Sequence, residues 1–435
     1  MKVKGAKQQT LLLTGVNGIV RALGLVMRVV LSRFLGAEIM GIMELSQSVH
    51  MVAISPLTSG LPAAVCRLTA KADNDQKTLP LASGIYLTRA VSLLMIPAFW
   101  LLSGPIARLT GDIRVMPSLW FSAPCILILG YSAVYNGYCY GTNLPHIPAV
   151  SELLEQCLRL VFTFAFLSIF RHLTASWMAC IPTVATMLAE VIGLGYVMHR
   201  LHRITVPVNQ SHVFQKSVLH LAVPTTLTRC LQTLLRSVTA IAIPIRLQQS
   251  GLSAAEATSR LGMLNGMVMP ILMLPCIFTS ALSMVMIPRI AQAEEQPSEL
   301  RRLLVKSVLA CMPFSALCAL GIALAASFLS IRVYRLAELQ ELFRLCAPMT
   351  LLFAANHLAG SALSALGQQK KSLFASAFVS LLTLGLTWMW AASPSLRLGG
   401  VIRAQYAGSL TSLLLSFWIL KDACKGTLTP DDRCV

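Results

Sequence analysis

The sequence is poor in charged residues, and acidic residues are the scarcer kind. Only 12% of its 435 residues are charged, whereas soluble domains carry about 25%. Its 17 acidic and 35 basic residues give a formal net charge of +18. Hydrophobic residues make up 56% of the chain, and the mean hydropathy is +0.71. This composition excludes an ordinary soluble domain and favours an all-α polytopic membrane protein.

Motifs for metal or redox chemistry are also missing. The twelve cysteines stand singly, and no CxxC pair or Cys/His spacing accompanies them. Isolated cysteines in apolar segments act as small apolar residues. We therefore expect no metal site, no disulfide framework and no cofactor.

Long apolar runs are present along the whole chain. Runs of about 20 residues are long enough to cross the hydrocarbon core of a bilayer. They should be helices, because backbone polar groups in lipid must be satisfied within their own segment. The first run follows MKVKGAK but lacks a small-residue cleavage pattern, so we interpret it as an uncleaved span. Twelve spans are predicted, at 10–33, 40–67, 79–103, 118–140, 150–170, 177–198, 217–246, 261–288, 305–329, 342–366, 372–392 and 399–420.

The lysines predict the orientation, because short cytoplasmic loops accumulate basic residues. A cytoplasmic N-terminus places every lysine on the cytoplasmic side. Both termini are then cytoplasmic, and segment 104–117 is outside. The basic excess therefore reflects membrane topology, and we expect no nucleic-acid partner. The lysines are Lys2, Lys4, Lys7, Lys71, Lys77, Lys216, Lys306, Lys370, Lys371, Lys421 and Lys425.

Two arginine pairs indicate an internal repeat, which is common in transporters. Each pair is spaced by seven residues, one in the first span and one in the seventh. We predict two six-helix lobes related by a pseudo-twofold axis along the membrane normal. Their expected ranges are 1–198 and 217–420, with a basic cytoplasmic linker at 199–216 and a short tail at 421–435. The matching positions are Arg21 with Arg229, Arg28 with Arg236, Pro62 with Pro288, and Gly141 with Gly367.

Close helix packing is predicted where two glycines are four residues apart. Gly137 and Gly141 lie on one face of the fourth span. Small residues at this spacing let helix backbones approach each other in a membrane.

The membrane arginines need compensation. Each would cost about 2.5–3.5 kcal/mol near mid-bilayer, or roughly 10–14 kcal/mol for the four together. A spacing of seven places both arginines of a pair on one face of their helix. Asn17 shares the face of the first pair, and Gln232 lies within that of the second. We expect these six residues to bind the substrate: Asn17, Arg21, Arg28, Arg229, Gln232 and Arg236.

Two explanations remain for these arginines. In the first they pair with membrane carboxylates, for which Glu44, Glu152, Glu155 and Glu190 are available, although Glu155 and Arg159 can satisfy each other locally. In the second they face a water-filled cavity that binds an anionic group. Because a guanidinium fork suits phosphate oxygens, a diphosphate is the natural ligand. Glu44 is the candidate for ion coupling.

Three stretches carry a resemblance to a known family: RALGLVMRVVLSRFLGAEIMG (21–41), SPLTSGLPAAVCRLTAK (55–71) and NGYCYGTNLPHIPAVSELLEQCLRL (136–160). The chain resembles the oligosaccharide and polysaccharide flippases of the multidrug/oligosaccharidyl-lipid/polysaccharide exporter superfamily, in the branch of stage V sporulation protein B. The resemblance implies an alternating-access protein of a bacterial plasma membrane. Its partners would be membrane lipids and a polyprenyl-diphosphate-linked glycan for the cell wall or another polysaccharide, moved to the outer leaflet.

Arg21 and Arg28 match the first-helix arginines of these flippases, whereas Arg229 and Arg236 rest mainly on the repeat. Twelve spans instead of fourteen, and an arginine spacing of seven instead of six, distinguish the chain from the main lipid II flippases. Nothing in the sequence requires more than a monomer. Three alternatives stay open: a drug/cation antiporter of the same superfamily, a non-transporting membrane scaffold, and a membrane enzyme. The short, acid-poor outer loops disfavour the enzyme.

Overall fold

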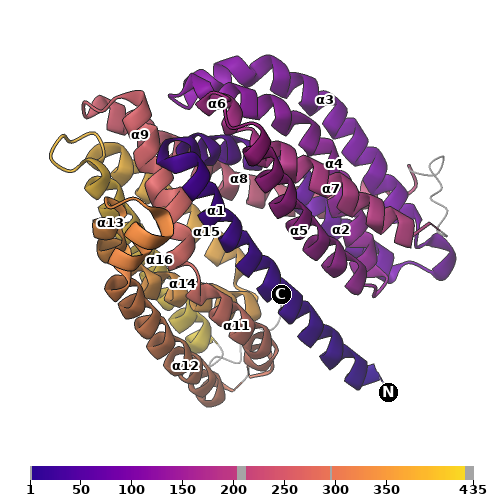
Figure 1. The fold of residues 1–435 in the computed structure, drawn as a ribbon. Helices are drawn as coiled ribbons and strands as arrows, with labels where there is room; N and C mark the ends of the chain where they lie inside the picture. The colour runs from indigo at the N-terminus through magenta and orange to yellow at the C-terminus, as the bar shows by residue number, and fades with distance from the viewer. Residues whose placement is uncertain (1, 203–211, 294–295, 427–435) are drawn as a thin grey trace. The chain divides into compact units, whose positions relative to one another are not determined.

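The chain is all-α in the computed structural model, which describes residues 2–202, 212–293 and 296–426 (Figure 1). For a minority of these residues, Asn17 among them, only the backbone is described. By its contacts the chain divides into two compact units. Unit 1 comprises Met1–Pro244 and Ala254–Gly262, and unit 2 comprises Ile245–Ser253 and Met263–Val435. The lobes at 1–198 and 217–420 stay a prediction, since the division by contacts falls elsewhere.

Unit 1 is a helical bundle in which α4 contacts most of the other helices. It packs against α1, α2, α3 and α7, while α5 packs between α1 and α7. The short α9 lies against α1. The helices are α1 (Lys2–Thr58), α2 (Gly60–Lys71), α3 (Leu79–Leu109), α4 (Met116–Gly141), α5 (His146–Ile169), α6 (Ala175–Met178), α7 (Ile181–Arg200), α8 (Gln215–Gln249, which continues into unit 2) and α9 (Ala254–Leu261).

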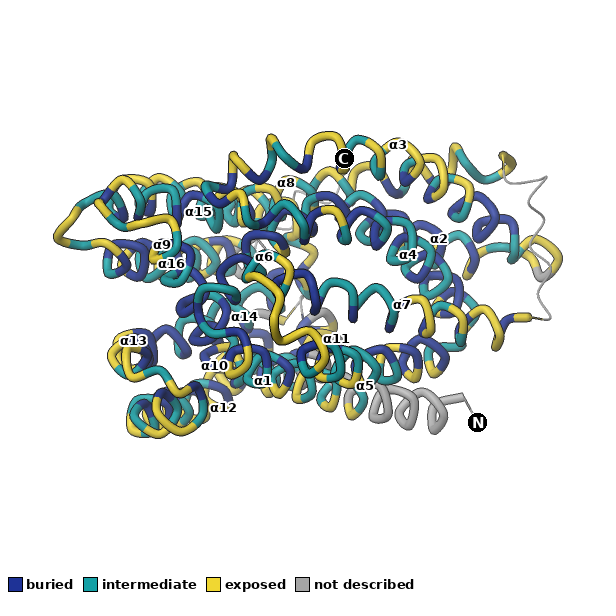
Figure 2. The backbone as a smooth tube through the Cα atoms, turned by 45° about the horizontal axis from the view of Figure 1, so that its top comes forward, coloured by how far each residue is buried: buried dark blue, intermediate teal, exposed yellow. Residues whose placement is uncertain are grey.

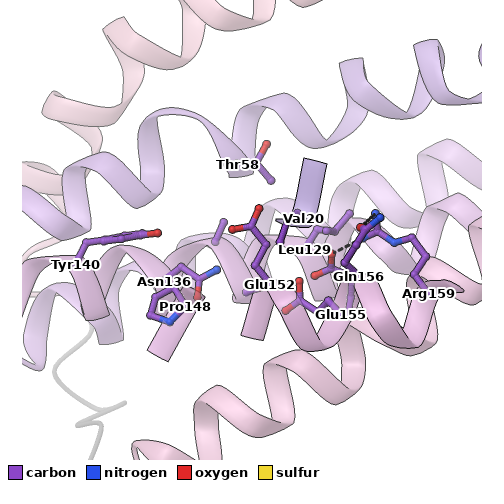
Figure 3. Close-up of a pocket in the computed structure, with 13 residues that line it drawn as sticks. Val20, Thr58, Leu129, Asn136, Tyr140, Pro148, Glu152, Glu155, Gln156 and Arg159 are labelled. Atoms are coloured by element: carbon purple, nitrogen blue, oxygen red, sulfur yellow. Dashed lines mark hydrogen bonds and ion pairs between the residues drawn. The ribbon is translucent and has the colours of Figure 1, made fainter. Parts of the chain in front are cut away.

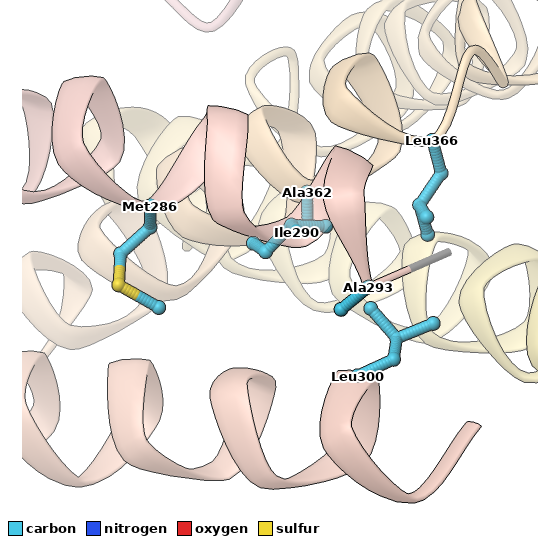
Figure 4. Packing of buried hydrophobic residues seen from close by; sticks show 6 residues of the cluster. All are labelled: Met286, Ile290, Ala293, Leu300, Ala362 and Leu366. Atoms are coloured by element: carbon cyan, nitrogen blue, oxygen red, sulfur yellow. The ribbon is translucent and has the colours of Figure 1, made fainter. Parts of the chain in front are cut away.

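Unit 2 is built around α14, which packs against α11, α12 and α16. Buried apolar side chains from α11, α12 and α14 meet in one cluster (Figure 4): Met286, Ile290, Ala293, Leu300, Ala362 and Leu366. The elements are a π-helix (Gly262–Val268), α10 (Met269–Leu272), α11 (Pro275–Gln292), α12 (Pro297–Leu324), a second π-helix (Phe328–Tyr334), α13 (Leu339–Cys346), α14 (Met349–Ala365), α15 (Gln369–Trp390) and α16 (Arg397–Gly426).

Buried and exposed residues alternate along the helices (Figure 2). Many of the exposed residues are large and apolar. Such surfaces suit lipid, and the chain is a multi-pass membrane protein. All twelve predicted ranges fall on helical segments, some of them broken. By length and mean hydropathy, six helices in the described part of the chain could cross a membrane, or seven if the bent pair α13 and α14 forms one span. The number twelve and the pseudo-twofold axis stay predictions.

Glycine at position 36 turns α1 sharply. Its φ of 74° and ψ of 177° interrupt the helix in the left-handed region, which residues with a Cβ rarely adopt. The turn brings Arg28, before it, to 2.6 Å from the Glu44 carboxylate beyond it. Two residues sixteen positions apart therefore meet because the helix is broken between them.

The close packing expected at Gly137 and Gly141 is confirmed, and the neighbour is α2. A Cβ at Gly137 would overlap the backbone of Pro62, and one at Gly141 would lie 2.7 Å from the carbonyl oxygen of Cys66. The absence of a side chain at both positions thus fixes the distance between α2 and α4.

A buried aspartate joins α1, α9 and the turn between α3 and α4. Asp112 accepts two hydrogen bonds from the Arg114 guanidinium, at 2.9 and 2.7 Å, and one from the Thr258 hydroxyl at 2.9 Å. Arg114 also pairs with Glu38 on α1. Burial alone would raise the pKa of Asp112, but these hydrogen bonds hold that pKa below its usual value.

A glycine exchange tests the α2–α4 contact. Gly137→Ala should destabilise the protein by about 1–3 kcal/mol, because the added methyl group overpacks the contact. The matched control is Gly195→Ala on α7, where a Cβ would have no neighbour within 4 Å, so the higher helix propensity of alanine should leave stability unchanged or slightly raised. Thermal unfolding in detergent measures both. Equal midpoints for the two variants would contradict the packing.

Cysteine labelling tests the predicted orientation. Ser118 is fully buried, but Ile113 in the same loop region is 53% exposed and suits a label. In a cysteine-free background, Ile113→Cys should react with an impermeant thiol reagent from outside intact cells. Asp75→Cys, also at an exposed position, should react only after permeabilisation. The opposite pattern would reverse the topology.

Candidate functional site

A cavity in unit 1 contains the Arg28–Glu44 pair. This cavity, here the arginine chamber, has a volume of about 540 Å³. Its walls come from both halves of α1 and from α4, α5 and α7. Its polar lining includes Gln47 and the buried His50, whose Nδ1 has no hydrogen-bond partner among the described residues. The residues around it are Val20, Gly24, Met27, Arg28, Leu31, Met40, Met43, Glu44, Gln47, His50, Met51, Ile54, Ser122, Cys125, Leu129, Gln156, Arg159, Pro182, Thr183, Thr186 and Glu190.

The second cavity, here the acidic chamber, adjoins the first and has a volume of about 370 Å³ (Figure 3). The two share Val20, Leu129, Gln156, Arg159 and Glu190. Three carboxylates and one guanidinium line the acidic chamber, so it is more negative than the arginine chamber. Its residues are Val20, Thr58, Leu129, Ser132, Ala133, Asn136, Tyr140, Pro148, Glu152, Glu155, Gln156, Arg159 and Glu190.

The shared wall contains an ion pair between α5 and α7. Arg159 donates to Glu190 and to the side-chain oxygen of Gln156, both at 3.3 Å. The side chain of Glu190 is only 10% exposed. A carboxylate this deep in an apolar helix requires a partner, and the sequence supplies it from the neighbouring helix.

Glu155 and Arg159 interact electrostatically, but they do not form the direct pair that their spacing allows. Glu155 instead accepts a hydrogen bond of 2.7 Å from Ser151, one turn earlier on α5. It packs against Gly193, where a Cβ would overlap its carboxylate. The Arg159 guanidinium therefore forms its ion pair with Glu190 on α7.

Of the five predicted substrate-binding residues whose side chains the structure describes, only Arg28 lines one of these chambers. Its pairing with Glu44 agrees with the explanation that membrane arginines meet carboxylates. Arg21 is exposed on α1 and interacts electrostatically with Glu152. The side chain of Asn17 lies outside the described residues.

The seventh-span arginines lie on an exposed side of α8. Ser237 donates to the carbonyl of Ser48 at 2.7 Å, and so it faces α1. Arg236 precedes it and therefore points about 100° away around the helix. Within the described part of the chain, neither Arg229 nor Arg236 forms an ion pair. Gln232 is half-buried on the same helix and lines neither chamber.

Sequence reasoning missed the polar face of α5 as a site. Glu152, Glu155 and Arg159 follow each other at intervals of three and four residues, which places them on one face of a helix. That spacing, within an otherwise apolar span, was the available signal. The described residues contain no group of three or more His, Cys, Asp or Glu side chains that could hold a metal ion.

The fold that carries these chambers is that of the multidrug and flippase transporters. An inward-facing multidrug resistance MATE family transporter of the MOP superfamily matches with a TM-score of 0.80 and 14% identity, over 95% of this chain and 99% of that one. The lipid II flippase MurJ in an inward closed conformation matches with a TM-score of 0.76 and 13% identity, over 96% and 90% of the two chains. The chain is thus an all-α membrane protein with a MATE-like fold.

The sequence comparison identifies the family. The model of the family "Polysaccharide biosynthesis protein" matches residues 6–294, and the chain belongs to this family. Stage V sporulation protein B of Bacillus subtilis (strain 168) is 26% identical over 425 residues, which cover 93% of this chain and 82% of that protein. The family expected from the three quoted stretches is therefore confirmed.

A double-mutant cycle tests the shared wall. Glu190→Gln should destabilise the chain by about 3–5 kcal/mol, because it leaves the Arg159 guanidinium without its carboxylate in a low-dielectric site. The double variant Arg159→Gln, Glu190→Gln should recover most of that loss, since neither charge remains. Thermal unfolding of the four proteins gives the coupling. If the two single effects simply add, the pair does not stabilise the wall.

Proposed function

We propose that this protein is a flippase that moves a polyprenyl-diphosphate-linked oligosaccharide from the cytoplasmic to the outer leaflet. The observation that carries the proposal is the guanidinium of Arg28, which faces the arginine chamber with Glu44 at 2.6 Å. A guanidinium in such a place offers several hydrogen bonds to phosphate oxygens. The family, and the lipid II flippase among the similar folds, support the same substrate class.

In this proposal Arg21, Arg28, Arg229 and Arg236 bind the diphosphate, assisted by Asn17 and Gln232. The two exposed arginines of α8 support a role in binding, because an arginine on an apolar helix is costly without a partner. Twelve spans in two pseudo-symmetric lobes would give the alternating access that flipping requires. The proposed location is a bacterial plasma membrane with both termini cytoplasmic.

The Arg28–Glu44 pair offers a way to couple binding to an ion. The carboxylate occupies the guanidinium donors that a phosphate would need. Protonation of Glu44 removes its charge and frees Arg28 for the diphosphate, whereas loss of the proton restores the pair and favours release. Binding on one side and release on the other requires such a difference between states.

A drug/cation antiporter is the second candidate. The acidic chamber favours it, since three carboxylates suit a cationic ligand, and so does the similarity in fold to a multidrug transporter. The arginines disfavour an antiporter of cations, because they are positively charged. Arg28 faces the adjoining chamber, and Arg229 and Arg236 are exposed on α8.

Arginine variants test the diphosphate site. Loss of a single charge-assisted contact is worth about 1.5–3 kcal/mol, so each Arg→Ala variant should bind a polyprenyl diphosphate roughly tenfold or more weakly. Arg→Lys should restore part of the affinity, because it keeps the charge but loses the fork. Binding and flipping are compared at equal abundance and thermal stability. Normal flipping by all four alanine variants would make the arginines structural.

A separate variant tests coupling. Glu44→Gln, which imitates the protonated carboxyl, should bind polyprenyl diphosphate at least as tightly as the wild type while net flipping falls. The part of the pH dependence of binding that comes from Glu44 should be lost in this variant, whereas any part from His50 or Glu190 in the same chamber should stay. Undiminished flipping with an unchanged pH dependence would remove Glu44 from the coupling mechanism.

A further inference from the structure

The acidic chamber differs from the arginine chamber in what it can bind. Its carboxylates come from Glu152, Glu155 and Glu190, and the one guanidinium among its described lining residues, that of Arg159, is engaged with Glu190 and Gln156. A phosphate group would be repelled there. The ligand must instead be uncharged or cationic and rich in hydrogen-bond donors.

The residues that line the acidic chamber are exposed at one end and buried at the other. Tyr140 is 47% exposed and Glu152 is also exposed, whereas Glu155 and Gln156 are 8% and 6% exposed. Figure 3 shows Tyr140 and Asn136 at one end, Glu152 in the middle, and Glu155 and Gln156 toward the other end. A ligand entering past Tyr140 would meet acceptor groups along its whole length.

The acidic chamber contains a buried hydrogen-bond acceptor that lacks a donor. The Oδ1 atom of Asn136 is buried and has no hydrogen-bond partner among the described residues. A buried acceptor without a donor is costly, and a ligand hydroxyl would satisfy it. The Ser132 hydroxyl can donate or accept, and the Thr58 hydroxyl, which already donates to the Ile54 carbonyl at 3.0 Å, can accept.

We infer that the acidic chamber binds a sugar unit of the lipid-linked substrate. Carboxylates and amides accept hydrogen bonds from ring hydroxyls, and the Tyr140 ring offers an apolar face for the C–H side of a pyranose. The described residues contain no group of three carboxylates arranged to hold a metal ion, and amides and a phenol line the chamber beside the carboxylates. This inference rests on the proposed function and adds to it the residues that read the glycan.

The position of the chamber agrees with the covalent structure of such a substrate. In a polyprenyl-diphosphate-linked glycan the first sugar is bonded directly to the diphosphate. The two chambers likewise share a wall, formed by Val20, Leu129, Gln156, Arg159 and Glu190. With the diphosphate at Arg28, the adjoining sugar would lie at this wall.

The test compares two probes on the full-length protein in detergent: a polyprenyl diphosphate, and the same lipid carrying one N-acetylhexosamine. Tyr140→Ala should weaken binding of the glycosylated lipid about tenfold and leave binding of the bare lipid unchanged. Glu152→Ala, which also removes the carboxylate that interacts with Arg21, should weaken binding of the glycosylated lipid more than that of the bare lipid. Tyr140→Phe keeps the ring and Glu152→Gln keeps an acceptor, so both should stay within about threefold of the wild type. Tyr86→Ala, at a similarly exposed tyrosine outside both chambers (49%), is the matched control.

The possible failures can be told apart. If the alanine variants weaken binding of both lipids equally, or of neither, the chamber does not bind the sugar, although the flippase proposal stands. If Glu152→Gln weakens binding of the glycosylated lipid as much as Glu152→Ala does, and the weakening depends on sodium concentration or pH, the chamber is a cation site. A wild-type protein that binds neither lipid refutes the proposed function and the sugar site together.

Discussion

The structure depends on one constraint: a charge inside a membrane helix must meet an opposite charge, a polar ligand or water. Arg28 meets Glu44 across the break at Gly36, and Arg159 meets Glu190 on the neighbouring helix. Both pairs lie in the walls of polar cavities within unit 1. The helices around them are held close by positions such as Gly137 and Gly193, where a side chain would collide with a neighbour. Charge compensation and close packing therefore shape the same space.

The two pairs differ in what they permit. Arg159 and Glu190 are 3.3 Å apart with Glu190 deep in the bundle, an arrangement suited to a fixed wall. The Arg28 side chain is 38% exposed, so water or a ligand can reach its guanidinium. In the mechanism that we propose, a substrate phosphate competes with Glu44 for those donors. An exchangeable pair beside a fixed one is what a carrier needs if it must release what it binds.

The helices could be predicted from the sequence, because apolar runs of membrane length are a local property. The family could also be predicted, from short stretches with a characteristic residue order. The partners of the charges could not, since they depend on packing. The spacing of four residues suggested that Glu155 and Arg159 pair with each other. In the structure Ser151 donates a hydrogen bond to Glu155, and Arg159 donates one to Glu190. The spacing of the charged residues indicates the polar face of α5, but it does not indicate which helix packs against that face.

A transport assay on the unaltered protein can distinguish a lipid-linked glycan from the other candidate substrates. Proteoliposomes of defined orientation would be supplied separately with a fluorescent polyprenyl diphosphate carrying one sugar, with a labelled phospholipid and with a cationic drug. We expect protein-dependent movement of the glycosylated lipid between leaflets, accelerated by a pH gradient, and no movement of the other two beyond that in empty liposomes. Transport of the cation without movement of the lipid would contradict the account and favour the antiporter.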